Sequence, residues 1–317
     1  MLQWVTMEVN TNMEKEYLNS LLKLPLLELL SLANKIRREY LGSKFELCSI
    51  INAKSGYCNQ DCKFCAQSTY HATNIATYPL RKKQEIVKAA KKAKEIGAEN
   101  FGIVTSGNRL TLLELEEIIS AISQIKKEIG ITVCASLGAL KKEELKKLKQ
   151  AGLTFYHHNI ETSPKFYKQI VSTHNFQQRV NTIRAAKEQG LEVCSGGIIG
   201  IGEAWQDRID MALVLKDLDV DSVPINILVP IKGTSLENVK PISCNDVIRT
   251  LSIFRIILKD KAIKIVAGRE SALGDFQGLG FMAGANGMLI GGYLTVKGRE
   301  LEADYKLVEE VKKLWDE

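Results

Sequence analysis

Eight short β-rich segments alternate with helix-length amphipathic stretches through this chain of 317 residues. Strands are predicted at 45–51, 100–104, 131–136, 153–160, 191–196, 222–229, 263–268 and 287–292. Between them apolar residues recur at helical spacing, as in 111–129 and 176–189, and glycines stand where several of these helices should end. Strands that alternate with helices run parallel, and eight of them can close a barrel. The pattern predicts an α/β fold, a (β/α)8 barrel of the TIM type.

Residues 17–41 precede the first strand and carry a helical pattern of their own. We therefore predict two parts: an N-terminal helical extension over 1–44, packed against the barrel base, and the barrel domain over 45–317. With 45% hydrophobic residues, the chain is able to bury a large core.

Charge and composition restrict the partners and the compartment. The net charge is +6, but the lysine pairs lie at helical spacing among glutamates, which is typical of solvated helix faces rather than of a nucleic-acid site. No apolar run reaches the roughly 20 residues of a membrane span, and the polar start lacks the order of a signal peptide. We expect a cytoplasmic protein with no nucleic-acid or membrane partner. In that reducing compartment, seven cysteines indicate metal or redox chemistry rather than disulfides.

Three of the cysteines lie within eight residues, as Cys58-x3-Cys62-x2-Cys65, in the long loop after the first strand. Structural zinc usually takes four ligands in spaced pairs, and no second pair follows at suitable spacing. Three thiolates suit a [4Fe-4S] cube, whose fourth iron then stays open to a small chelating ligand. The alternative, three thiols buried as small hydrophobes, fits poorly with the polar residues at 59–63.

The spacing, with Phe64 before the last cysteine, is similar to the motif of the radical S-adenosylmethionine (SAM) enzymes. Six segments together resemble the biotin synthase family: INAKSGYCNQDCKFCAQS (51–68), YHHNIETSPKFY (156–167), VCSGGIIGIGE (193–203), SVPINILVPIKGT (222–234), VAGRE (266–270) and FMAGAN (281–286). The resemblance implies a radical SAM barrel in which a [4Fe-4S] cluster cleaves SAM to a 5′-deoxyadenosyl radical. It implies a sulfurtransferase that inserts sulfur at C6 and C9 of dethiobiotin, with the sulfur taken from an auxiliary iron–sulfur cluster.

Roles carry over from the family to matching positions. The resemblance assigns the [4Fe-4S] cluster to Cys58, Cys62 and Cys65, and it assigns the ureido ring of dethiobiotin to Asn226. Asn159 is implied to contact both substrate and cofactor. The remaining residues that it assigns to SAM are Tyr57, Phe64, Glu161, Arg179, Gly197 and Ile198. Family members often have aspartate where this chain has Glu161, a change that lengthens the side chain and keeps its acceptors.

The auxiliary cluster is where this chain departs from the family pattern. The usual [2Fe-2S] cluster implies ligands at Cys134, Cys194 and Arg269, and a further cysteine on the second strand, where this chain has Gly102. Two-residue alternation places Cys48 on the same face of the first strand as Glu46, Ile50 and Asn52. Our hypothesis is that Cys48, Cys134 and Cys194 hold a [4Fe-4S]-type cluster that could carry an extra sulfide, with Arg269 nearby. The alternative for Cys48 is a packed core thiol.

The other candidates have weaker claims. Cys244 opens a predicted helix, and we interpret it as structural. Of His157 and His158, at most one points inward, and His71 and His174 lie in predicted loops, so the sequence suggests polar packing or surface positions for all four.

Two other functions stay open, and the family suggests partners. One alternative is a sister radical SAM enzyme of the hydrogenase-maturation or methylornithine-forming type, and the other is a non-catalytic iron–sulfur scaffold. Flavodoxin or ferredoxin is the electron donor that the resemblance implies, alongside the iron–sulfur assembly machinery, and the resemblance also implies a homodimer.

Overall fold

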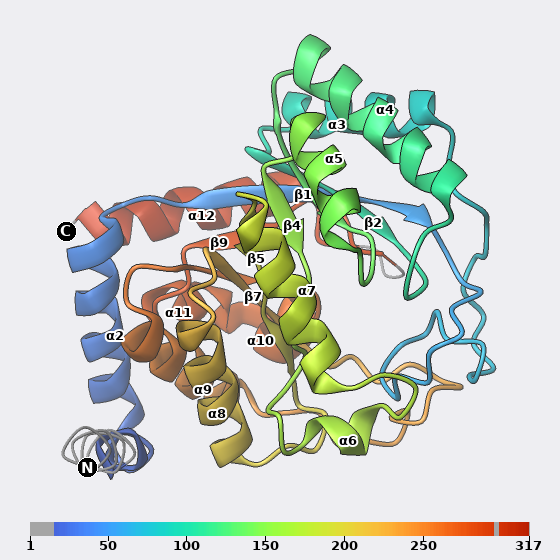
Figure 1. The fold of residues 1–317 in the computed structure, drawn as a ribbon. Helices are drawn as coiled ribbons and strands as arrows, with labels where there is room; N and C mark the ends of the chain where they lie inside the picture. Colours follow the sequence, from blue (N-terminus) through green and yellow to red (C-terminus); the bar gives the residue numbers. More distant parts are fainter. Residues whose placement is uncertain (1–15, 295–297, 317) are drawn as a thin grey trace, which may run out of the picture.

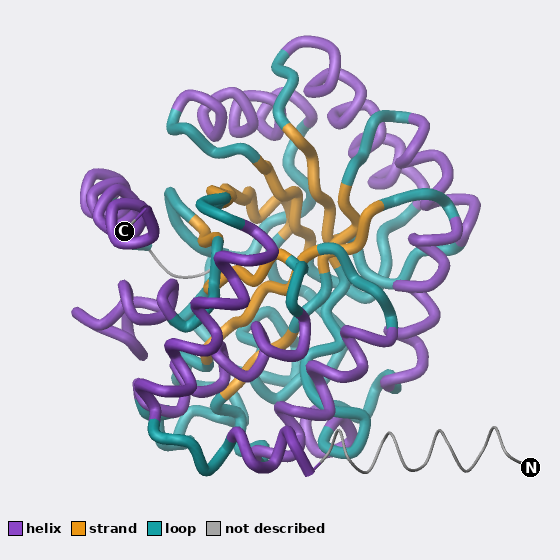
Figure 2. Tube along the Cα trace, turned by 90° about the vertical axis from the view of Figure 1, so that its left-hand side faces the viewer, coloured by secondary structure: helices purple, strands orange, loops and turns teal. Residues whose placement is uncertain are grey.

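The computed structural model describes residues 16–294 and 298–316. Within them a single parallel sheet curls into a barrel, with the strand order β5-β4-β3-β2-β1-β9-β8-β7-β6. Strands occupy the centre of the molecule and helices surround them (Figure 2). The segments are β1 (Glu46–Lys54), β2 (Asn100–Thr105), β3 (Thr132–Ser136), β4 (Phe155–His157), β5 (Glu192–Cys194), β6 (Gly197–Ile199), β7 (Ser222–Ile227), β8 (Ala262–Ile265) and β9 (Gly287–Leu289).

The barrel closes through a divided strand. β5 and β6 are two halves of one barrel position, and β5 reaches β7 through the single pair Cys194–Ser222. Between the halves the backbone of Gly196 approaches β7 so closely that an added Cβ would lie 1.9 Å from the carbonyl oxygen of Pro224. Only glycine fits there. Counting β5 and β6 as one, the strands fill eight barrel positions, so the predicted (β/α)8 fold and all eight predicted strands are confirmed.

Helices connect the strands in the order expected for such a barrel (Figure 1). Those that the sequence predicted end within a few residues of their expected bounds, and Gly97, Gly130, Gly152 and Gly190 all follow helices with positive φ, between 69° and 104°. Besides a helical stretch at 16–21, the described helices are α2 (Leu26–Leu41), α3 (Lys83–Glu95), α4 (Leu112–Glu128), α5 (Lys142–Gln150), α6 (Tyr167–Ile170), α7 (Phe176–Glu188), α8 (Trp205–Asp217), α9 (Cys244–Leu258), α10 (Arg269–Leu273), η1 (Gly274–Phe276), α11 (Gln277–Met282) and α12 (Leu301–Asp316). The short α6 and the run from α10 to α11 were not predicted.

Side chains alternate between two environments along the strands. On β2, Phe101 and Ile103 are 1% and 0% exposed and belong to the core between sheet and helices. Their neighbours Gly102 and Val104 face the barrel lumen, where they line a cavity. The apolar core therefore lies outside the sheet, which leaves the lumen free for polar and sulfur-bearing side chains.

Helix α2 packs against α9 beside the barrel, and its C-terminal end lies near the C-terminal end of α12 (Figure 1). The predicted helical stretch at 17–41 is confirmed as helix at 16–21 and as α2. Arg249 of α9 donates to the carbonyl oxygens of Leu22 and Leu24, and the Arg37 guanidinium lies 3.7 Å from the ring centroid of Trp315 on α12. The domain boundary at 44 remains a prediction, and residues 1–15 of the extension lie outside the described residues. None of the described helices is both long enough and apolar enough to span a bilayer.

Candidate active site

The barrel lumen contains a cavity of about 550 Å³ that brings together six of the seven cysteines. All seven are free thiols, and Cys244, at the start of α9, lies outside the cavity. The predicted site residues that line this cavity are Cys48, Cys58, Cys62, Phe64, Cys65, Cys134, Asn159, Glu161, Arg179, Cys194, Ile198 and Asn226. Two groups of thiols thus share one space, one on the loop after β1 and one on the strands.

The loop after β1 is folded by its own backbone hydrogen bonds. The amide of Cys58 donates to Gln67 O over 3.1 Å, and the amide of Cys65 donates to Cys62 O over 2.9 Å. Gly56 enters the loop with φ 76°, and an added Cβ there would lie 2.4 Å from Cγ2 of Thr77. Burial raises the pKa of Cys62 to about 12 and that of Cys65 to about 11. Both groups are therefore neutral thiols until a metal displaces the proton.

Asp61 ties this loop to the segment between α6 and α7. Its carboxylate accepts from the backbone amides of Ser172 (2.9 Å) and Thr173 (3.1 Å) and from both hydroxyl groups, at 2.5 and 2.9 Å. Burial opposes ionisation of Asp61, but these donors outweigh it and hold the pKa of the carboxyl group below its ordinary value. The contact contributes stability at neutral pH and loses it only as the pH falls through that depressed pKa.

Replacing Asp61 with asparagine should loosen the cysteine loop. The amide keeps one acceptor oxygen but loses the charge that makes these hydrogen bonds strong. We expect faster amide hydrogen exchange over residues 56–73 and roughly tenfold weaker iron retention against a chelator, the lower limit for changes around metal ligands. Asp217→Asn, at an exposed position at the end of α8, is the control. Equal iron retention in both variants would contradict this role.

Asn159, Glu161 and Arg179 meet just beyond β4. Arg179 Nη1 donates to the carbonyl oxygen of Asn159 over 3.0 Å and lies 3.6 Å from Glu161 Oε1. Asn159 Oδ1 accepts from the amide of Gly196 over 3.1 Å. Glu161 has φ 69°, a left-handed conformation that is uncommon for glutamate and that holds its side chain towards the cavity. The structure thus brings these three predicted residues together.

The remaining predicted residues are more dispersed. Asn226 of β7 lines the cavity and donates to Gly197 O over 3.3 Å, so Gly197 contributes backbone rather than cavity wall. Tyr57 is 71% exposed and is not among the cavity-lining residues, although it adjoins Cys58, which is.

Deeper in the lumen, Cys48, Cys134 and Cys194 form the second group of thiols. Burial raises the pKa of all three, and the positive charge of Lys264 acts on each of them in the opposite direction. Lys264 stands on β8, with its ammonium 2.8 Å from Glu46 Oε2 and only 7% of its side chain exposed. Cys48 lines the cavity, so the face that it shares with Ile50 is the interior one.

Two neighbours shape this deeper part of the cavity. Nδ1 of His157 lies 3.4 Å from Sγ of Cys194, and burial lowers the pKa of this histidine to about 4. Gly102, at the position where the family resemblance implies a cysteine, is the register partner of Ile50 on the neighbouring strand β1. A Cβ added at Gly102 would lie 2.9 Å from Cγ2 of Ile50, closer than real Cβ contacts come.

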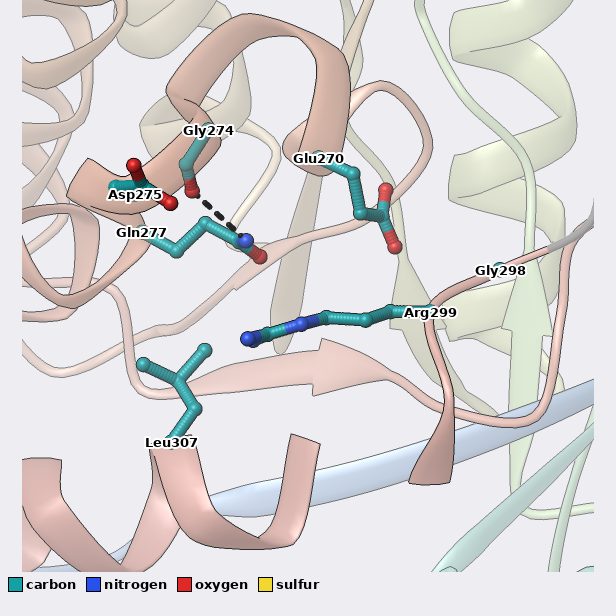
Figure 3. Close-up of a pocket in the computed structure, with 7 residues that line it drawn as sticks. All are labelled: Glu270, Gly274, Asp275, Gln277, Gly298, Arg299 and Leu307. Carbon is teal, nitrogen blue, oxygen red and sulfur yellow. Dashed lines mark hydrogen bonds between the residues drawn. The ribbon is translucent and has the colours of Figure 1, made fainter. Parts of the chain in front are cut away.

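Arg269 does not join the deeper thiols, contrary to the expectation from the sequence. Gly268, with φ 85°, starts α10 and turns Arg269 away from the lumen. The guanidinium is fully buried and pairs with Asp304 of α12 over 3.0 Å and with Gln277. A separate cavity of about 490 Å³ lies beside this network (Figure 3). Its lining residues are Glu270, Gly274, Asp275, Gln277, Gly298, Arg299 and Leu307.

The donor types in the main cavity fit iron–sulfur chemistry. Within the described ranges no three His, Cys, Asp or Glu side chains surround a position for a single ion. In each of the two groups, however, the thiols lie close enough that the charge of one raises the pKa of another. Soft thiolate sets of this kind select iron–sulfur clusters, zinc or copper(I). Sequence reasoning missed Asp61, His157 and Lys264, although a lysine inside the apolar run at 263–266 is a readable signal of a buried partner.

Comparisons with known proteins show which family this chain belongs to. Residues 53–215 match the model of the Radical SAM superfamily, and residues 224–312 match the Biotin and Thiamin Synthesis associated domain. Among solved structures, methylornithine synthase aligns with a TM-score of 0.77 at 24% identity, covering 92% of this chain and 91% of that one. HydG, a maturase of the [FeFe]-hydrogenase, aligns with a TM-score of 0.77 at 17% identity, covering 92% and 69%. These two likenesses support the barrel fold alone.

Curated relatives are much more similar in sequence. The biotin synthase of Thermotoga neapolitana is 55% identical over 274 residues, which are 86% of this chain and 98% of the relative. That of Thermotoga petrophila is 51% identical over 298 residues, 94% and 98% of the two chains. That of Clostridium perfringens is 48% identical, covering 90% and 89%. This chain therefore belongs to the radical SAM superfamily and, within it, to the biotin synthase family.

Proposed function

We propose that this chain inserts one sulfur atom between C6 and C9 of dethiobiotin to form biotin. The observation that carries the proposal is a single cavity lined by two separate groups of three cysteines. One group suits a cluster that binds SAM, and the other suits a cluster that donates sulfur. An enzyme with a single cluster would need only the first.

Cys58, Cys62 and Cys65 would hold the [4Fe-4S] cluster, and its open iron would bind SAM. When bound, this pair supplies the 5′-deoxyadenosyl radicals that remove the two hydrogens which sulfur replaces. Arg179 would pair with the SAM carboxylate, and Glu161 would accept from its ribose hydroxyls. We further assign Tyr57, Phe64, Gly197 and Ile198 to the surroundings of SAM, by their matching positions in the family motifs.

The substrate would lie between the two groups of thiols. An amide side chain offers both a donor and an acceptor, which matches a ureido ring, and Asn226 would make this contact. Asn159 would contact both substrate and SAM. Its position is fixed, because its Oδ1 accepts from the amide of Gly196 and its carbonyl oxygen accepts from Arg179. These fixed asparagines would orient dethiobiotin rather than take part in bond making.

Cys48, Cys134 and Cys194 would hold the auxiliary cluster, of [4Fe-4S] type with an extra sulfide or of [2Fe-2S] type. Three thiolates bring negative charge into a buried space, which is costly without a compensating cation. Lys264 provides that cation, and Glu46 holds its ammonium in place over 2.8 Å. We therefore assign Lys264, rather than Arg269, to the surroundings of this cluster. His157 is a further polar neighbour, because its Nδ1 lies beside Sγ of Cys194.

Several partners follow from this function. Flavodoxin or ferredoxin would supply the electron for SAM cleavage, and exposed Tyr57 and Tyr70 mark the loop near which such a donor would dock. The iron–sulfur assembly machinery would load both clusters. We also propose a cytoplasmic homodimer, and an N-terminal helical part over 1–44 that supports the barrel domain over 45–317.

The decisive experiment is anaerobic reconstitution with iron and sulfide, followed by Mössbauer spectroscopy and an assay with dethiobiotin. We expect two spectroscopically distinct clusters, and biotin together with 5′-deoxyadenosine as products. Cleavage of SAM without biotin would favour a sister radical SAM enzyme that acts on another small molecule. Clusters that bind SAM but never yield 5′-deoxyadenosine would favour an iron–sulfur scaffold.

A further inference from the structure

A line of four polar side chains runs from α7 to the cysteine loop. Arg179 Nε lies 2.7 Å from the hydroxyl oxygen of Tyr167, and that oxygen lies 2.8 Å from His174 Nδ1. The other ring nitrogen, Nε2, lies 3.6 Å from Sγ of Cys62. The sequence suggested only a surface or packing role for His174, and no family motif quoted above includes it.

The direction of each hydrogen bond in this line follows from the first. A guanidinium can only donate, so the Tyr167 oxygen accepts from Arg179 Nε. The Tyr167 oxygen could also accept from Nδ1, but its buried hydroxyl proton would then have no acceptor among the contacts of the described residues, so the proton points to Nδ1 of His174, which accepts it. A neutral imidazole carries one proton, and with Nδ1 as acceptor that proton sits on Nε2. The group that faces Cys62 is therefore an N–H donor.

The surroundings keep both intermediate groups neutral. Because Nδ1 accepts a hydrogen bond, the His174 ring carries no second proton and is neutral, and Tyr167, which donates to it, is the neutral phenol. Around His174 the other charged groups are Arg179 and Asp61, and Asp61 is engaged with Ser172 and Thr173. The direction of the hydrogen bonds along the line thus follows from geometry, and the charges around His174 are consistent with that direction.

We propose that His174 is a positioning residue that donates a hydrogen bond from Nε2 to the sulfur of Cys62, with Arg179 and Tyr167 fixing its tautomer. The inference rests on the proposed function only in requiring that the loop thiols hold a cluster. A hydrogen bond to a cluster thiolate lowers its electron density and makes reduction of the cluster easier. The line would also couple SAM to the cluster, because Arg179 is the residue assigned to the SAM carboxylate.

The proposal is tested by the midpoint potential of the loop cluster, measured by EPR-monitored titration of the reconstituted protein. His174→Phe keeps a ring but removes both nitrogens. We expect the equilibrium constant for reduction to fall about tenfold, the size of a hydrogen bond to a charged group, which corresponds to about 59 mV for one electron. His174→Gln, which can place an amide N–H near Cys62, should recover most of the loss.

A second variant tests the origin of the tautomer. Tyr167→Phe keeps the ring but frees Nδ1, so part of the His174 population would carry its proton there and the potential should fall by a smaller amount. Tyr40→Phe removes the hydroxyl from a ring on α2 that is 46% exposed and lies outside the cavity, and it should leave the potential unchanged.

Iron content separates this inference from the proposed function. If the wild-type protein takes up no cluster, the proposed function fails. If His174→Phe binds a full complement of iron and its potential matches wild type, the inference is overturned. If His174→Phe loses iron, Tyr167→Phe and His174→Gln decide. A lowered midpoint potential in Tyr167→Phe together with a near-normal potential in His174→Gln supports the hydrogen bond. An unchanged potential in Tyr167→Phe overturns the proposed line of hydrogen bonds.

Discussion

Replacing Cys65 with alanine will abolish the reductive cleavage of SAM. The cysteine loop has three thiols, one for each of three irons, so the loss of one leaves a cube without a stable attachment. Because changes beside metal ligands already cost 10–100-fold, loss of a ligand should lower 5′-deoxyadenosine formation by more than about a hundredfold. The variant should also hold about four fewer irons per chain than wild type. Product chromatography and iron analysis after anaerobic reconstitution measure both effects.

Cys244→Ala is the matched control for this experiment. It removes a thiol of the same size from the first turn of α9, outside the main cavity. Iron content and SAM cleavage should remain at wild-type levels. Undiminished 5′-deoxyadenosine production by Cys65→Ala would remove the loop from the catalytic centre, and the assignment of the SAM site would go with it.

Replacing Cys48 with alanine will separate the two halves of the reaction. Cys48 lies deep in the lumen with Cys134 and Cys194, under the charge of Lys264. We expect the Mössbauer signal of the auxiliary cluster to disappear and biotin formation to fall more than about a hundredfold. The loop cluster has all its thiols in this variant, so SAM should still yield 5′-deoxyadenosine.

Ser49→Ala controls for disturbance of β1. Ser49 follows Cys48 directly, and strand alternation places its side chain on the opposite face, outside the set of cavity-lining residues. This variant should retain both cluster signals. An unchanged auxiliary signal in Cys48→Ala would instead identify Cys48 as a packed core thiol, and Cys134 and Cys194 would then need another partner.

The features that a local sequence pattern determines could be predicted from the sequence. Strand positions, the main helices and the loop that bears Cys58, Cys62 and Cys65 follow from apolar periodicity and residue spacing. Strand alternation, with its strict period of two, also grouped Cys48 with Ile50 on one face of the first strand, but it did not give which face is the interior. Each of these features depends on residues that are neighbours along the chain.

Features that depend on distant residues were not predictable. Arg269 was placed near the auxiliary thiols by its family motif, but its direction depends on the left-handed Gly268 and on Asp304, which lies 35 residues further along the chain. The contact between Asp61 and Ser172 joins residues 111 apart, and that between Cys62 and His174 joins residues 112 apart. No local pattern reports such pairs, because they form only when the barrel brings its loops together.

Gly102 and Ile50 restrict the evolutionary paths open to this barrel. A cysteine introduced at position 102 would place its Cβ 2.9 Å from Cγ2 of Ile50, so one of the two side chains would have to shift. Shrinking Ile50 first would open a gap in the lumen wall with nothing to fill it. Each single change is therefore costly by itself, while the two together compensate each other. Such coupling between positions 50 and 102 favours the present arrangement of thiols over one with a cysteine at position 102.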